Sequence, residues 1–159
     1  MFSMDSAGDL HAALVHYPIV LISLAFVFDI LYWFQRKEYL QTIGNWLIVS
    51  AFIIMIPTAI AGWFATYLYP DNDPDIFRHA TMAIVTAAYT LAYAALRGYA
   101  IAVNKRMCPY LYLLLSLINV ILVGLTAEFG GIVVRGVGLT HESLREPGTS
   151  LPYDRIKEK

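Results

Sequence analysis

Two histidines, His16 and His79, stand inside long apolar stretches of the chain. Ionisable side chains are costly in a lipid bilayer, and those that persist there usually serve a site. A neutral imidazole can bind a haem iron or a divalent metal through one of its ring nitrogens. These two side chains therefore predict a ligand site, provided that the fold brings them together.

Four apolar stretches account for most of the 159 residues. They cover residues 10–34, 40–69, 76–103 and 110–134. A helix needs about 20 residues to cross a bilayer, and a helix satisfies its own backbone groups in lipid. The connections between the stretches are short and therefore require antiparallel neighbours. The sequence predicts an all-α integral membrane four-helix bundle with up-down-up-down topology over residues 1–139, followed by a polar tail over residues 140–159.

The composition agrees with a membrane protein. Hydrophobic residues make up 58% of the chain and charged residues 14%, whereas soluble domains carry about 25% charged residues. A net charge of −1 gives no electrostatic basis for binding nucleic acid. The single cysteine, Cys108, excludes an intrachain disulfide and a cysteine metal cluster. The segment before the first stretch is acidic, so we expect the first span itself to direct insertion.

Basic residues predict the orientation of the bundle. They flank the connections that follow the first and third spans: Arg36, Lys37, Arg97, Lys105 and Arg106. Acidic residues dominate the opposite end: Asp5, Asp9, Asp71, Asp73 and Asp75. The positive-inside rule therefore predicts that both termini lie outside the cytoplasm. Basic residues of the tail oppose this prediction, but they are mixed with acidic ones.

The predicted topology brings His16 and His79 to one end of the bundle. The first and third spans both run inward, which places the two imidazoles ~5–10 Å below the outer boundary. These spans are diagonal across the core, so the rings could face each other and bind haem b as its two axial ligands. Arg78 at the outer rim could then meet a haem propionate.

A metal site without haem is the alternative. Glu128 of the outward-running fourth span lies near the same boundary as His16 and His79, and two histidines with a carboxylate suit zinc, copper or iron. On a regular helix His11 lies ~140° around the axis from His16. We therefore expect structural roles for His11, and a solvent-exposed position for His141 in the tail.

Two more polar residues lie inside the spans. Asp29 follows aromatic and aliphatic residues in the inner half of the first span, so we expect it to be protonated, paired or turned to a polar cavity. Asn119, near the middle of the fourth span, is expected to hydrogen-bond across the bundle. A part in a proton or quinone path is the functional alternative for these residues.

Several motifs resemble a bacterial membrane family, domain of unknown function 2231. The segment Leu10-His11-Ala12-Ala13-Leu14-Val15-His16-Tyr17-Pro18-Ile19 resembles the family's opening motif, and weaker similarities continue to about residue 140. They are Phe28-Asp29, the segment from Pro57 to Gly62, Arg78-His79-Ala80 and the glycine-rich segment 130–139. Ala12 departs from a common proline, and Glu128-Phe129 stand where relatives often carry a histidine, which would imply fewer cofactors or none.

The resemblance implies four spans in a bacterial inner membrane and an uncharacterised or redox-linked role. Relatives are sometimes joined to Rieske or c-type cytochrome modules, which implies electron exchange with a periplasmic cytochrome, a Rieske protein or a quinone. We therefore expect a membrane electron-transfer subunit that binds haem b. The alternatives are a non-redox accessory or assembly subunit of a larger membrane complex, with no cofactor, and a metal-binding membrane protein. No known set of catalytic residues was recognised in the sequence.

Overall fold

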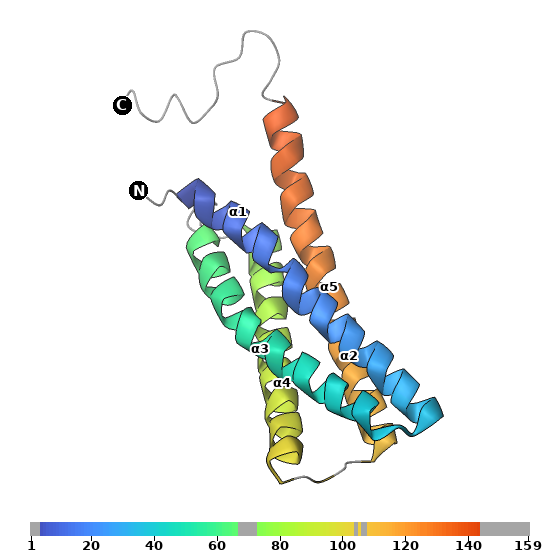
Figure 1. Ribbon diagram of the computed structural model, residues 1–159. Coiled ribbons are helices and arrows are strands. Elements are labelled where there is room, and N and C mark those ends of the chain that lie inside the picture. The colour runs from blue at the N-terminus through green and yellow to red at the C-terminus, as the bar shows by residue number, and fades with distance from the viewer. Residues whose placement is uncertain (1–3, 67–72, 104, 106–107, 144–159) are drawn as a thin grey trace.

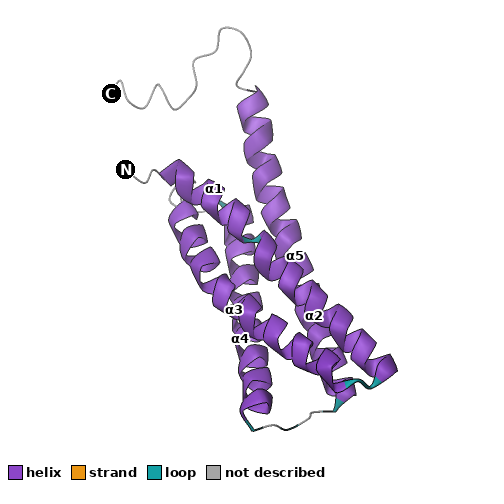
Figure 2. Ribbon diagram, viewed as in Figure 1, coloured by secondary structure: helices purple, strands orange, loops and turns teal. Residues whose placement is uncertain are grey.

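The computed structural model describes residues 4–66, 73–103, 105 and 108–143, and within them the chain forms five helices (Figure 1). The helices are α1 (Met4–Leu14), α2 (His16–Gln35), α3 (Glu38–Thr66), α4 (Pro74–Ala102) and α5 (Pro109–Ser143). The first candidate membrane span, Gly8–Gln35, combines α2 with most of α1, so the helices make four spans. The described residues are almost entirely helical (Figure 2). The predicted all-α four-span bundle is confirmed.

Pro18 explains why the first span is divided into two helices. A proline has no backbone N–H and its ring collides with the carbonyl four residues earlier, here that of Leu14. Helix α1 ends at Leu14 and α2 begins at His16, with Val15 between them. The chain nevertheless continues in nearly the same direction, because Val15 N–H still donates to the His11 carbonyl at 3.0 Å.

Local turn chemistry ends one helix and begins the next. Arg36 adopts a left-handed conformation with φ 55°, and its N–H donates to the Tyr32 carbonyl at 2.9 Å, which closes α2. The Asp73 carboxylate accepts from the N–H of Asp75 at 2.9 Å and caps α4, whose first residue is Pro74. These short connections produce antiparallel neighbours.

The helices form a bundle in which α2 and α4 are diagonal. Helix α2 packs against α3 and α5, and α4 packs against the same two helices, whereas the backbones of α2 and α4 do not come close to each other. The expected diagonal arrangement of the first and third spans is therefore confirmed. Helix α1 packs mainly on α3. The start of α1 and the end of α5 lie at one end of the bundle, the terminal end, and the α2–α3 and α4–α5 connections lie at the other, the loop end (Figure 1).

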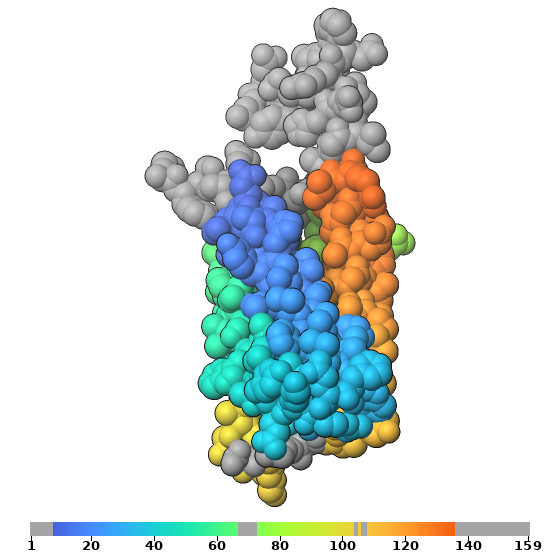
Figure 3. Space-filling view, turned by 45° about the vertical axis from the view of Figure 1, so that its right-hand side comes forward, coloured from blue at the N-terminus to red at the C-terminus, as the bar shows by residue number. Residues whose placement is uncertain are grey.

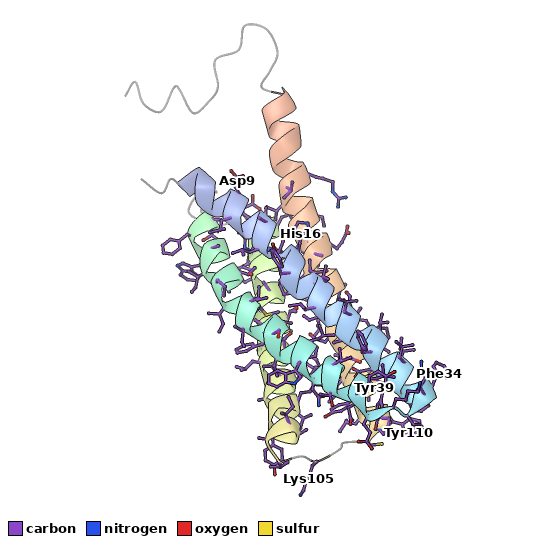
Figure 4. The ribbon with its side chains drawn as sticks, in the orientation of Figure 1. Asp9, His16, Phe34, Tyr39, Lys105 and Tyr110 are labelled. Atoms are coloured by element: carbon purple, nitrogen blue, oxygen red, sulfur yellow. The ribbon has the colours of Figure 1, made fainter. Side chains whose placement is uncertain are left out.

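The outer surface of the bundle suits a lipid bilayer. Large apolar side chains stay exposed along every span, among them Val20, Ile53, Ile60, Ile84, Leu114 and Ile121. Soluble proteins rarely expose so much contiguous apolar surface. Phe34, Tyr39 and Tyr110 gather at the loop end (Figure 4), where aromatic side chains favour the membrane–water interface. The bundle is thus a membrane protein in contact with lipid.

Helix α5 extends beyond the predicted end of the bundle. It runs to Ser143, past the expected boundary at residue 139, while residues 144–159 of the predicted polar tail lie outside the described residues. The side chain of His141 and the positions of Asp71 and Arg106 are also outside the described part of the chain.

Candidate functional site

His11 and His79 face each other at the terminal end of the bundle. His11 lies on α1 and His79 on α4, and their ring centroids are 6.3 Å apart with an angle of 77° between the ring planes. Both residues are half-buried. We refer to them as the histidine pair.

The expected pairing of His16 with His79 is corrected by this arrangement. His16 is exposed, and its Nδ1 donates to the Ala12 carbonyl of the same span at 2.8 Å. Figure 4 places it on the outer side of the bundle, where α1 meets α2. The reason is the phase of the helix: Pro18, Ile22 and the residues that follow them face the core, and His16 precedes Pro18 by only two positions.

Each ring of the histidine pair is oriented by a backbone carbonyl of the next helix. His11 Nδ1 donates to the Thr58 carbonyl at 2.9 Å, and His79 Nδ1 donates to the Thr126 carbonyl at 3.1 Å. A carbonyl can only accept, so Nδ1 carries the proton and Nε2 of the neutral ring holds a free lone pair. Among the described residues, Nε2 of neither ring makes a hydrogen bond. Metal-binding histidines are commonly oriented in this way.

Glycines make room for both rings. A Cβ at Gly62 of α3 would stand 2.8 Å from the Cε1 and Nδ1 atoms of His11. A Cβ at Gly130 of α5 would stand 3.1 Å from Cε1 of His79. Thr58 and Thr126, whose carbonyls accept the bonds, each lie one helical turn before these glycines. Each ring is therefore seated on a small patch of helix backbone.

The surface has a hollow between α1 and α5 at the terminal end of the bundle. The space-filling view shows a gap between α1 and the upper part of α5, with α4 visible behind it (Figure 3). This opening follows from the packing, because α1 lies against α3 and not against α5.

The other residues expected at the site are not gathered there. Arg78 is exposed and pairs with Asp75 at 3.4 Å, and Glu128 is exposed and pairs with Arg135 at 3.2 Å. No group of three or more His, Cys, Asp or Glu side chains that could hold a metal occurs in the described residues. The expected set of His16, His79 and Glu128 is therefore not assembled.

A second polar cluster lies nearer the loop end, around a buried ion pair of Asp29 and Arg97. Both side chains have no exposed surface, and the Arg97 guanidinium donates to Asp29, to the Tyr93 hydroxyl and, at 3.1 Å, to Asn45 Oδ1. The Tyr112 ring covers the guanidinium, with its centroid 4.2 Å from Cζ. Arg97, expected among the basic residues at the membrane boundary, is instead buried inside the bundle, where Asp29 neutralises its charge.

Hydroxyl and amide groups continue from this cluster toward the histidine pair. Thr90 Oγ1 donates to Asn119 Oδ1 at 2.9 Å, and the Thr86 and Thr126 hydroxyls are 2.8 Å apart. The expected hydrogen bond of Asn119 across the bundle is thus present, and it joins α4 to α5. Asp29 is paired, which was one of the three states expected for it.

The buried face of α2, which the structure defines, explains why His11 and not His16 faces the bundle. The buried residues of α2 recur at steps of three and four, and the same spacing continued back from Pro18 reaches His11 and misses His16. Arg97 lies on the corresponding buried stripe of α4. Depth in the membrane alone favours His16, because it does not take into account which face of the helix points inward.

Comparison with known proteins gives one match. A family described as "Predicted membrane protein (DUF2231)" matches residues 8–143. None of the curated proteins and none of the solved structures compared with the chain matches it.

Proposed function

Because the chain belongs to the DUF2231 family of predicted membrane proteins, whose description states a membrane location and no reaction, we propose a function from the histidine pair. The protein is a membrane electron-transfer subunit that binds haem b between His11 and His79. His11 takes the ligand role expected of His16. Haem iron changes between two oxidation states, so the bound group would carry one electron.

This proposal rests on the distance between the rings of His11 and His79. Bonds from a metal to an imidazole nitrogen are about 2.0–2.1 Å long, and the nitrogen lies about 1 Å from the ring centre, so two rings on opposite sides of one metal have centres roughly 6 Å apart. The centroids of the histidine pair are 6.3 Å apart. The proton on each Nδ1 leaves Nε2 free to bind.

The number of protein ligands favours haem over a bare ion. Zinc and copper sites usually need three or four protein ligands, and His11 and His79 supply two. A porphyrin provides four nitrogens of its own, so two axial histidines complete its iron. The hollow between α1 and α5 lies at the same end of the bundle as the histidine pair.

The proposal includes an orientation and partners. Both termini and the histidine pair lie toward the outer face of a bacterial inner membrane, with Arg36, Lys37 and Lys105 at the cytoplasmic face. A periplasmic cytochrome, a Rieske protein or a quinone would exchange the electron. Arg78 would contact a propionate, because its exposed pair with Asp75 is weak enough to be exchanged.

Absorption spectroscopy of the full chain tests the proposal. The protein is expressed with ample haem, extracted in detergent and examined as a reduced-minus-oxidised difference spectrum. We expect the sharp bands of a low-spin haem with two histidine ligands. His11→Ala and His79→Ala should each abolish the low-spin spectrum, and His16→Ala, the matched control, should retain it.

Two outcomes would contradict the proposal. One is wild-type protein that is folded but free of haem after such expression, which would favour a non-redox accessory subunit of a larger complex. The other is a spectrum that depends on His16 and not on His11.

A further inference from the structure

The buried positions of the first and third spans repeat at an offset of 68 residues. Helix α2 buries five residues: Pro18, Ile22, Ala25, Asp29 and Tyr32. Helix α4 buries the five residues found 68 positions later, Thr86, Thr90, Tyr93, Arg97 and Ala100, and in addition Ala94. The contact between Asp29 and Arg97 itself joins residues 68 positions apart. The two helices therefore turn equivalent faces to the core.

The second helix of each hairpin follows the same offset. His11 bonds to the carbonyl of Thr58 and His79 to that of Thr126, and both bonds span 47 residues. Gly62 and Gly130 receive the two rings in the same manner. The hairpin of α1, α2 and α3 and the hairpin of α4 and α5 thus share one plan, although their side chains differ at most positions.

The packing of the two hairpins fits an approximate two-fold axis along the bundle. Helix α2 packs on α5 as α4 packs on α3, while the equivalent helices α2 and α4 are diagonal. Under two-fold symmetry, two equivalent residues can touch each other only near the axis. His11 with His79, and Asp29 with Arg97, are two such contacts, one toward each end of the bundle.

The environment of the buried ion pair differs between the hairpins in charge and in size. The first hairpin supplies the carboxylate and leaves space at Gly44, where a Cβ would stand 2.9 Å from Arg97 Nη1. The second hairpin supplies Arg97 and two aromatic rings, those of Tyr93 and Tyr112, which cover the guanidinium at 4.6 and 4.2 Å. Gly44 and Tyr112 occupy equivalent positions. The first hairpin therefore provides a recess, and the second hairpin provides the large side chains that fill it.

We propose that the two hairpins are copies of one structural unit and that the Asp29–Arg97 contact determines how they pair. A first hairpin packs against a second hairpin, whereas two first hairpins or two second hairpins do not pack against each other. Two first hairpins would bury two carboxylates beside an unfilled recess. Two second hairpins would bury two guanidiniums and four tyrosine rings in the same space. A buried charge without its partner is strongly unfavourable, so the mismatched pairs are excluded. This inference is independent of haem binding.

Charge reversal in the full chain tests the inference. Asp29→Arg places two arginines at the axis and Arg97→Asp places two aspartates there, so each variant alone should reach the membrane as folded monomer at about a tenth of the wild-type level or less. The two variants are then coexpressed with different tags. By exchanging hairpins, they can form a 1:1 dimer that contains one native Asp29–Arg97 contact and one reversed contact.

We expect the two variants to rescue each other and to co-purify, whereas differently tagged wild-type chains do not co-purify. The double variant Asp29→Arg/Arg97→Asp should also accumulate as monomer above the level of either single variant. Glu128→Arg and Arg135→Glu, which reverse an exposed ion pair, are the matched control and should behave as wild type.

The inference is overturned if the single variants accumulate as wild-type-like monomers. It is also overturned if neither coexpression nor the double variant recovers folded protein, because both arrangements restore opposite charges at the axis.

Discussion

The ring of His11 lies directly on Gly62, so closely that a Cβ at this position would stand 2.8 Å from the ring. The glycine thereby allows Nδ1 of His11 to reach the Thr58 carbonyl one turn earlier on α3. A side chain of any size at position 62 would separate α1 from α3 or turn the ring away. This relationship leads to the first of four predictions about stability.

Gly62→Ala should lower the free energy of unfolding by about 1–3 kcal/mol, because the added methyl group overpacks the contact with His11. Gly124→Ala is the matched control, since nothing lies within 4 Å of a Cβ at that position. The control should be neutral or gain up to about 1 kcal/mol from helix propensity. Unfolding in detergent measures both. Equal stability of the two variants would contradict the described position of His11.

Asp29→Ala should destabilise the protein by about 3–5 kcal/mol, because it leaves the Arg97 charge buried without a partner. The double variant Asp29→Leu/Arg97→Met should recover most of this loss, since it removes both charges and keeps apolar volume in the core. Unfolding of wild type, single and double variants checks the prediction. A double variant that is less stable than the single one would contradict the prediction that the unpaired Arg97 charge causes the loss of stability.

Gly44→Ala should cost about 1–3 kcal/mol, because its Cβ would stand 2.9 Å from Arg97 Nη1 and 3.1 Å from Asp29 Oδ1. The cost should shrink when the same change is made in the Asp29→Leu/Arg97→Met protein, where the guanidinium is absent. A double-mutant cycle measures this coupling. Strict additivity of the changes would exclude a direct contact.

Thr90→Val should destabilise the bundle by about 0.5–1.5 kcal/mol, because it removes the hydrogen bond from Thr90 to Asn119 between α4 and α5. Thr81→Val is the matched control on the same helix, since the exposed Thr81 hydroxyl donates only to the Phe77 carbonyl of its own helix. The control should change stability by less than about 0.5 kcal/mol. A larger effect at Thr81 than at Thr90 would contradict the prediction.

The architecture could be predicted from the sequence because a lipid bilayer permits few folds. Long apolar stretches must form helices in a bilayer, and short connections such as that at Arg36 make consecutive helices antiparallel. The diagonal positions of the first and third spans follow from this topology. The sequence also indicated that Asp29 and Asn119 are interior polar residues, because a polar group inside an apolar span needs a partner.

The partners of these residues depended on which face each helix turns inward. His11 and His16 are only five positions apart, yet the face that includes Pro18 and Ile22 leaves the first half-buried and the second exposed. Arg97 resembled a boundary charge by its place in the sequence, and it is buried because Asp29 meets it from a helix 68 residues away. These positions are determined by contacts between side chains of distant segments. The hydropathy of the sequence does not reveal such contacts.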